Sequence, residues 1–251
     1  MIFHFTLLLW SLIFSAGLWF VAQGEVVLGW SWYFYTIGPL ALISIIAARR
    51  VTHRTVDAAI PMLLSVTAPV LLSLIDAPLE RELFVMIAGV MYYLGLLALY
   101  RLHYAPTDQT AQSMLSVAVM SAVFFYYAGI YGFYVNFNFP IWGLMLLFLS
   151  GTAAASYQTF VVRGRKERRR ALSYSLVIGI IMGEVAWALG FWPFGYLTTG
   201  AIALVLYAIL WDIAFDVFHR ELSIRRVALR ILFFLGLILL LLFSTPWHIL
   251  A

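Results

Sequence analysis

The residues best suited to chemistry form a short series near the C-terminus. Asp212, Asp216 and His219 are separated by four and three residues, so a helix places them on one stripe. Carboxylate and imidazole groups serve as general acids and bases and as metal ligands. Asp212 and His219 lie about 10.5 Å apart along a helix axis, which is too far for all three to bind one ion. Asp212 with Asp216, or Asp216 with His219, could supply two ligands beside others from neighbouring helices.

Arginines close to these carboxylates suggest a simpler role for them. Asp216 and Arg220 form an i, i+4 pair. Asp212 lies about 12 Å along its helix from Arg220. After a short connection, Arg230 lies about 6 Å along the next helix from Arg226, and an arginine side chain spans the difference. Ionised groups within apolar helices usually pair, so we expect Arg230 to bind Asp212 or Asp216. A functional station at the same carboxylates is the alternative.

Glu184 is the most informative single residue. It lies about 21 Å along a helix from Arg170, and no basic residue of any apolar segment lies at that level. It must therefore be protonated, hydrogen-bonded to a hydroxyl or indole group, or in contact with water. A functional role and a plain hydrogen bond between helices both stay open. Asp212 and Asp216 lie about 12 and 6 Å along their own helix from the inner membrane boundary, and Glu184 lies about 21 Å from it. Carboxyl groups at these three depths also suit a proton relay.

The densest charge lies in one short run between two apolar segments. It contains Arg163, Arg165, Lys166, Arg168, Arg169 and Arg170. Such a cluster beside a helix attracts anionic lipid headgroups, and the acidic surface of a partner protein would serve equally well. The alternative is a topology anchor that holds the connection on one side of a membrane.

The composition places these residues in a membrane protein. Of 251 residues, 65% are hydrophobic and 10% are charged, whereas soluble domains carry about 25% charged residues. The chain has no cysteine, which excludes disulfides, iron–sulfur clusters, zinc–thiolate sites and thiol catalysis. Its one lysine, Lys166, lies in the basic run, which excludes a retinal Schiff base within a helix. We expect no resident metal, no cofactor and no nucleic-acid partner.

Nine segments are apolar and long enough to cross a bilayer as helices, which takes about 20 residues. They are Ile2–Val21, Val26–Ala47, Val56–Ile75, Leu83–Tyr100, Ala111–Tyr134, Pro140–Val162, Ala171–Phe191, Tyr196–Phe218 and Val227–Ser244. The connections are too short for a soluble domain. The sequence therefore predicts an all-α polytopic transmembrane helix bundle that forms a single domain over residues 1–251.

The distribution of basic residues predicts the orientation. With the N-terminus in the cytoplasm, 14 of the 15 basic residues fall on the inner side and only Arg81 falls outside. Nine crossings then place the C-terminus outside. Seven or eleven crossings are the alternatives, because two compensating errors in the segments would preserve this charge pattern. The aromatic residues near the outer boundaries form the belt expected at a membrane–water interface, or alternatively line a site for an apolar ligand. They are Trp30, Trp32, Tyr33, Tyr35, Trp142, Trp192 and Trp247.

Small residues and prolines predict how some helices pack. Gly179, Gly183, Ala186 and Gly190 follow one another at spacings of four, three and four, which allows a neighbouring helix to approach closely. We therefore expect this segment to be central in the bundle. Proline at positions 61 and 69 predicts a bend in the third segment.

The second half of the chain resembles a prokaryotic family of multi-pass membrane proteins of unknown function. The resemblance covers about the last 70 residues. It rests on Glu184 with Trp187, Trp192-Pro193-Phe194, Thr198-Thr199, Arg225-Arg226 and Ser244-Thr245-Pro246-Trp247. It implies a bacterial inner membrane and supplies neither an activity nor catalytic residues.

Three functions follow, in order of preference. The first is a non-enzymatic membrane subunit or scaffold of a larger assembly, because no reaction motif is present. The second is a small transporter or proton pathway through Glu184, Asp212 and Asp216. The third is a lipid-modifying enzyme at the inner face. In it, Asp212, Asp216 and His219 supply acid–base groups or metal ligands, and the basic run binds a lipid phosphate.

Overall fold

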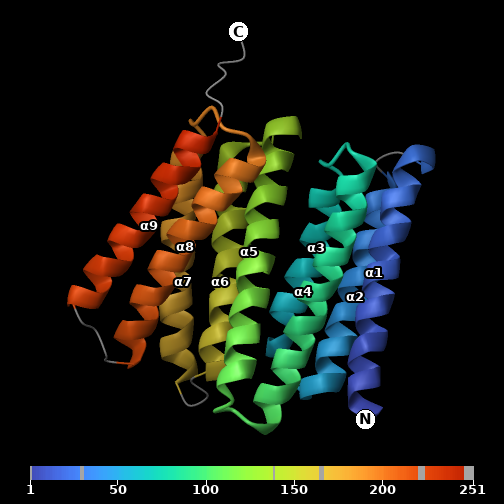
Figure 1. Ribbon diagram of the computed structural model, residues 1–251, viewed down its shortest axis with the longest axis horizontal. Coiled ribbons are helices and arrows are strands. Elements are labelled where there is room, and N and C mark those ends of the chain that lie inside the picture. Colours follow the sequence, from blue (N-terminus) through green and yellow to red (C-terminus); the bar gives the residue numbers. More distant parts are fainter. Residues whose placement is uncertain (1, 29–30, 138, 164–166, 220–223, 246–251) are drawn as a thin grey trace. The chain divides into compact units, whose positions relative to one another are not determined.

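The computed structural model describes residues 2–28, 31–137, 139–163, 167–219 and 224–245. Side chains are described for all of these except 2–3, 24–28, 31–34, 163, 219 and 226. All regular structure in these ranges is helical, which confirms the all-α class (Figure 1). The elements are α1 (Ile2–Leu28), α2 (Ser31–Thr52), the short 3-10 helix η1 (Val56–Ala58), α3 (Ala59–Leu72), α4 (Pro78–Tyr104), α5 (Gln109–Phe137), α6 (Ile141–Arg163), α7 (Arg168–Leu189), α8 (Tyr196–His219) and α9 (Ile224–Ser244).

Within the described ranges, seven helices are long and apolar enough to cross a membrane. These stretches are His4–Gln23, Pro78–Tyr104, Gln109–Phe137, Ile141–Val162, Arg168–Leu189, Tyr196–Phe218 and Val227–Ser244. The apolar stretch Val56–Leu72 is shorter, and α2 is not among the seven. Each of the nine predicted segments nevertheless corresponds to one α-helix.

The helix ends differ from the predicted segments at several places. The helix α1 continues through the expected turn at residues 23–25 and ends at Leu28. The third segment is divided, because η1 precedes an α3 of only 14 residues. Pro61 lies in the first turn of α3, where a missing N–H costs no helical hydrogen bond, and Pro69 lies inside α3 three residues before its end.

The chain forms two compact units, Met1–Gly129 and Ile130–Ala251, and the single domain expected from the sequence stays a prediction. In the first unit, α1 packs against α2 and α4, and α3 packs against α2 and α4. The ring of Phe14 stacks on Tyr92, with ring centroids 4.3 Å apart. The Tyr92 hydroxyl lies 2.9 Å from the Ser44 hydroxyl, which also contacts Ser65. These hydrogen bonds satisfy polar groups within an apolar core.

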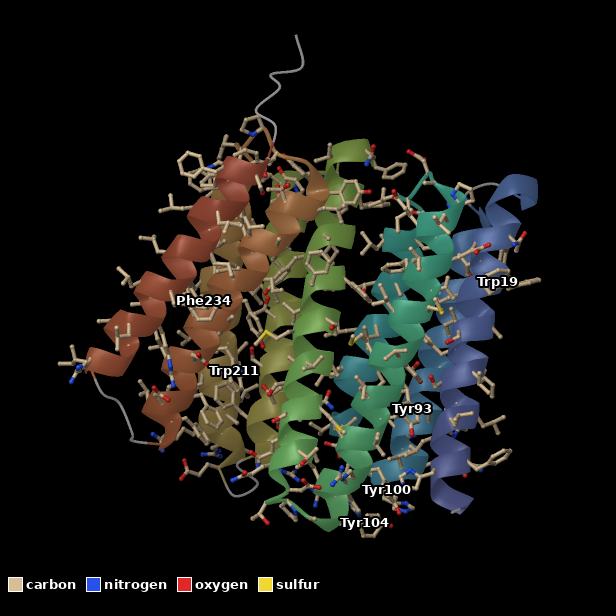
Figure 2. All side chains as sticks on the ribbon, viewed as in Figure 1. Trp19, Tyr93, Tyr100, Tyr104, Trp211 and Phe234 are labelled. Atoms are coloured by element: carbon tan, nitrogen blue, oxygen red, sulfur yellow. The ribbon has the colours of Figure 1, made fainter. Side chains whose placement is uncertain are left out.

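In the second unit, α7 packs against α6 and α8, and α8 packs against α9. A Cβ atom added at Gly179 would lie 2.8 Å from the carbonyl oxygen of Leu149 on α6, and one at Gly183 would lie 3.2 Å from that of Met145. The predicted close approach at these glycines is therefore confirmed. Between α6 and α8, the indole Nε1 of Trp211 (Figure 2) donates to Thr159 Oγ1 at 3.1 Å.

The described members of the expected aromatic belt lie on the surface. Tyr35, Trp142 and Trp192 are exposed. Trp30 and Trp247 and the side chains of Trp32 and Tyr33 lie outside the described residues.

Candidate functional site

The helices α8 and α9 bring the predicted acidic pair and its arginine together. Arg230 Nη1 donates to Asp216 Oδ2 at 2.9 Å and lies 3.9 Å from Asp212 Oδ2. The side chain of Asp216 is 11% exposed, that of Asp212 35% and that of Arg230 38%. The expected pairing of Arg230 with these carboxylates is therefore present, and it involves both of them.

This arrangement joins α9 to α8, because both carboxylates lie on α8 and Arg230 lies on α9. The side chain of His219 lies outside the described residues, as does Arg220, so the expected contributions of both stay predictions. Among the residues with described side chains, no three or more of His, Asp and Glu form a group that could hold a metal ion.

Glu184 lies apart from this cluster, on an exposed face of α7. Within the described part of the chain it has no hydrogen bond or ion pair, and it does not contact Asp212 or Asp216. The side chains on the same face are large and apolar: Leu176, Ile180, Trp187 and Phe191 are all exposed. An ionisable group therefore lies in the middle of an apolar surface.

The face of Glu184 differs from the face that packs against α6. Gly179, Gly183 and Ala186 lie on the packed face. Five residues of helix turn Glu184 about 140° away from Gly179. The expected central position of this segment therefore holds for only part of its circumference, because α7 is buried on one side and open on the other.

The basic run is only partly described. Arg168 and Arg169 are exposed, whereas the side chain of Arg163 and all of Arg165 and Lys166 lie outside the described residues. Arg170 has partners within its own unit. It donates to Glu167 Oε2 at 3.0 Å and to the carbonyl oxygen of Val217 at 3.4 Å, near the end of α8.

The guanidinium of Arg170 also lies over two rings, 5.6 Å from the Tyr174 centroid and 5.1 Å from that of Phe218. A cation at the C-terminal end of a helix interacts favourably with its dipole and free carbonyl groups. Arg170 therefore joins the start of α7 to the end of α8 and is less available to a lipid than Arg168 and Arg169.

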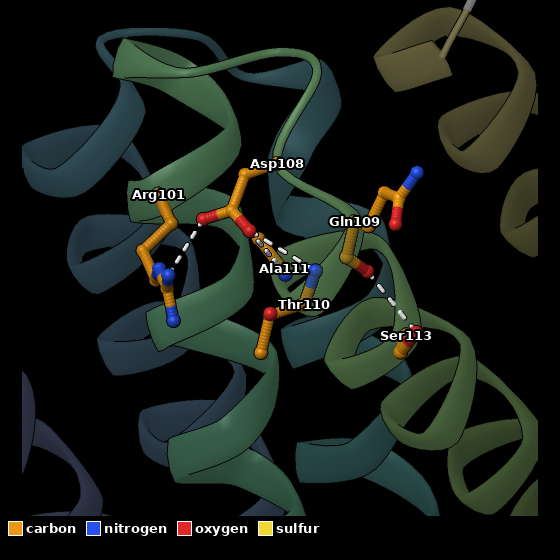
Figure 3. A network of polar contacts seen from close by, with 6 residues as sticks. All are labelled: Arg101, Asp108, Gln109, Thr110, Ala111 and Ser113. Atoms are coloured by element: carbon orange, nitrogen blue, oxygen red, sulfur yellow. Dashed lines mark hydrogen bonds and ion pairs between the residues drawn. The ribbon is translucent and has the colours of Figure 1, made fainter.

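Sequence reasoning missed a polar contact at the end of α4. Arg101 Nη2 lies 2.7 Å from Asp108 Oδ2, and Asp108 Oδ1 accepts hydrogen bonds from the backbone N–H groups of Thr110 and Ala111 (Figure 3). Asp108 thus caps α5 while it neutralises Arg101. An aspartate directly before a helical segment is the signal that identifies such a cap.

Two histidines at the same end of the first unit were also missed. The rings of His53 and His103 have centroids 6.4 Å apart. His53 has a φ of 55°, a left-handed conformation that follows the end of α2, and its N–H donates to the Arg49 carbonyl at 2.8 Å. The contact places the C-terminal ends of α2 and α4 side by side.

Two apolar grooves complete the description of the surface. One, of about 370 Å³, lies between α1 and α4 and is lined by Leu8, Ser11, Leu12, Ser15, Val85, Met86, Gly89, Val90 and Tyr93. The other, of about 330 Å³, is lined by Trp192, Pro193, Phe194 and Leu242. Trp192 is one of the aromatic residues for which a site for an apolar ligand was the alternative to membrane anchoring.

Comparison with known sequences assigns the chain to a family. The family described as "Protein of unknown function (DUF5656)" matches residues 3–245. The chain belongs to this family. The match extends the resemblance seen in the last 70 residues to nearly the whole chain and agrees with an uncharacterised family. Neither a curated protein nor a solved structure matches the chain.

Proposed function

We propose that this chain is a non-enzymatic, membrane-embedded subunit of a larger assembly, bound to its partner through the exposed face of α7. The observation that carries the proposal is Glu184. It lies among exposed apolar side chains without a partner in the described structure. Ionisable side chains within membrane helices are rare and normally face protein or water.

The charged residues of α8 and α9 need no external partner, because Arg230 binds Asp216 and Asp212 within the same unit. Glu184 has no such partner in the described residues. A helix of another protein that packs against α7 at the depth of Glu184 would provide one. The transport hypothesis stays a prediction, since the described contacts join Glu184 to neither aspartate. The lipid-modifying hypothesis also stays a prediction, since the side chain of His219 lies outside the described residues.

The proposal includes an orientation in a prokaryotic cell membrane. Nine helices cross it, with the N-terminus in the cytoplasm and the C-terminus outside. In the first unit, Arg49, Arg50 and Arg101 lie near the ends of α2 and α4 that the histidine contact joins. In the second unit, Arg168 and Arg169 begin α7. Both groups support a cytoplasmic face that attracts anionic lipid headgroups.

Because the chain has no cysteine, a single introduced cysteine tests the proposal. Ile180→Cys, labelled with a photoreactive maleimide in native membranes, should form an adduct with a protein. Leu232→Cys is the matched control, because Leu232 is exposed on α9 and has no ionisable residue beside it on an apolar surface. Adducts with lipid alone from both positions would contradict the proposal.

A further inference from the structure

A side chain that pairs with Glu184 must lie at the same depth in the membrane. Glu184 lies about 24 Å along α7 from Arg168, whereas Arg230 lies only about 9 Å along α9 from its start. An arginine side chain does not span this difference of about 15 Å. Within the described second unit, therefore, no basic side chain reaches the level of Glu184.

In a symmetric dimer of this chain, the Glu184 of one copy lies at the same depth as the Glu184 of the other copy. Most soluble oligomers are symmetric, and two-fold dimers are the commonest. When the two-fold axis runs along the membrane normal, each residue lies at the same depth as its counterpart in the other copy. A second copy that packs on the same face of α7 therefore brings its own Glu184 to the level of the first.

The face is suited to such self-association. Leu176, Ile180, Glu184, Trp187 and Phe191 follow one another at spacings of four, four, three and four, so they form one seam along α7. Trp187 and Phe191 already contact edge to face, with ring centroids 5.1 Å apart. The seam has apolar residues on both sides of a single carboxyl group, and two such seams match when they lie side by side.

We infer that the partner at this face is a second copy of the same chain, with the two Glu184 carboxyl groups hydrogen-bonded across a two-fold axis. This rests on the proposed function, since it names the partner at the same site. A protonated carboxyl group donates through its O–H, and a carboxylate accepts. A pair that shares at least one proton therefore satisfies both groups, and an O–H to carboxylate hydrogen bond is among the strong ones.

Energy transfer between labelled copies in lipid nanodiscs or proteoliposomes tests the inference. Donor and acceptor dyes are attached to Ile224→Cys, an exposed position at the start of α9. The unsubstituted seam should give a dimer. Glu184→Leu should weaken dimerisation by about 3- to 30-fold, the range for interhelical hydrogen bonds, and Glu184→Gln should retain most of it, because two amides also pair. Leu232→Ala on α9 is the matched control and should change nothing, because it shortens an exposed apolar side chain without adding a polar group.

A mixing experiment gives the sharpest result. Copies with Glu184→Lys should not dimerise with one another, because two ammonium groups repel, but they should pair with copies that retain Glu184. Equal dimerisation of all variants, or a monomer throughout, would overturn the inference. If the chain is monomeric while Ile180→Cys captures a different protein, the second copy is wrong and the subunit role stands. If neither experiment detects a partner, both fail.

Discussion

The contact between Arg230 and Asp216 should stabilise the association of α9 with α8 by an amount that can be measured. The perturbation is a double-mutant cycle of Asp216→Asn and Arg230→Gln, which replaces each charged group with a neutral amide. Arg230 Nη1 lies 2.9 Å from Asp216 Oδ2, within hydrogen-bond range, and 3.9 Å from Asp212 Oδ2, outside it. A second cycle of Asp212→Asn with Arg230→Gln should therefore give a smaller coupling energy than the cycle with Asp216→Asn.

The expected magnitude follows from burial. Hydrogen bonds to charged groups contribute about 1.5–3 kcal/mol, and fully exposed ion pairs contribute about 0–1 kcal/mol. Asp216 is close to the buried limit and Arg230 is not, at 11% and 38% exposed. We expect a coupling of about 2 kcal/mol for Asp216 and about 0.5 kcal/mol for Asp212. At about 2–4 °C per kcal/mol for a chain of this size, a coupling of about 2 kcal/mol corresponds to about 4–8 °C in Tm.

Thermal unfolding in mild detergent, followed by tryptophan fluorescence, measures the four corners of the cycle. Glu167→Gln is the matched control, because the pair of Glu167 with Arg170 is at the surface, with Glu167 54% exposed, and should contribute close to nothing. Equal effects of Asp216→Asn and Asp212→Asn, or a coupling energy near zero for Asp216, would refute the reasoning.

Three further predictions concern packing, hydrogen bonding and topology. Gly179→Ala should destabilise the chain by about 1–3 kcal/mol, because its Cβ meets α6, whereas Gly236→Ala meets no atom within 4 Å and should not destabilise; thermal unfolding compares them. Trp211→Phe should cost about 1 kcal/mol in the same assay, since it loses the hydrogen bond to Thr159. Reporters fused after residues 50 and 136 should lie in opposite compartments, and finding both in one compartment would exclude the alternating topology.

Helices were the most predictable feature, because apolar runs of membrane length leave the backbone few alternatives. The ends were less predictable. Gln23, Gly24 and Glu25 suggest a turn by polarity, yet no proline interrupts them and one glycine costs a helix only about 1 kcal/mol, so α1 continues to Leu28. Apolar length also concealed the division of the third segment, where a short η1 precedes α3.

A polar contact was predictable where the rise per residue of two connected helices gives the positions of both side chains along the helix axes. Arg230 and Asp216 lie on two helices joined by a short connection, so their levels follow from counting residues. Arg101 and Asp108 lie across a turn instead, and their contact depends on the path of that turn as well as on distance along a helix. The same reason conceals the contact of His53 with His103, which requires two separate helix ends to meet.

The exposed face of α7 that contains Glu184 was only partly predictable. The depth of Glu184 in the membrane follows from the sequence, and its angular distance from Gly179 follows from the helical period. What the sequence does not contain is the number of helices that surround α7, since each added neighbour would cover another part of its circumference. In the second unit α6 covers the glycine face, and the seam with Glu184 stays open. An ionisable residue within a membrane helix normally faces protein or water. The proposed assembly supplies the protein that the described second unit does not place beside Glu184.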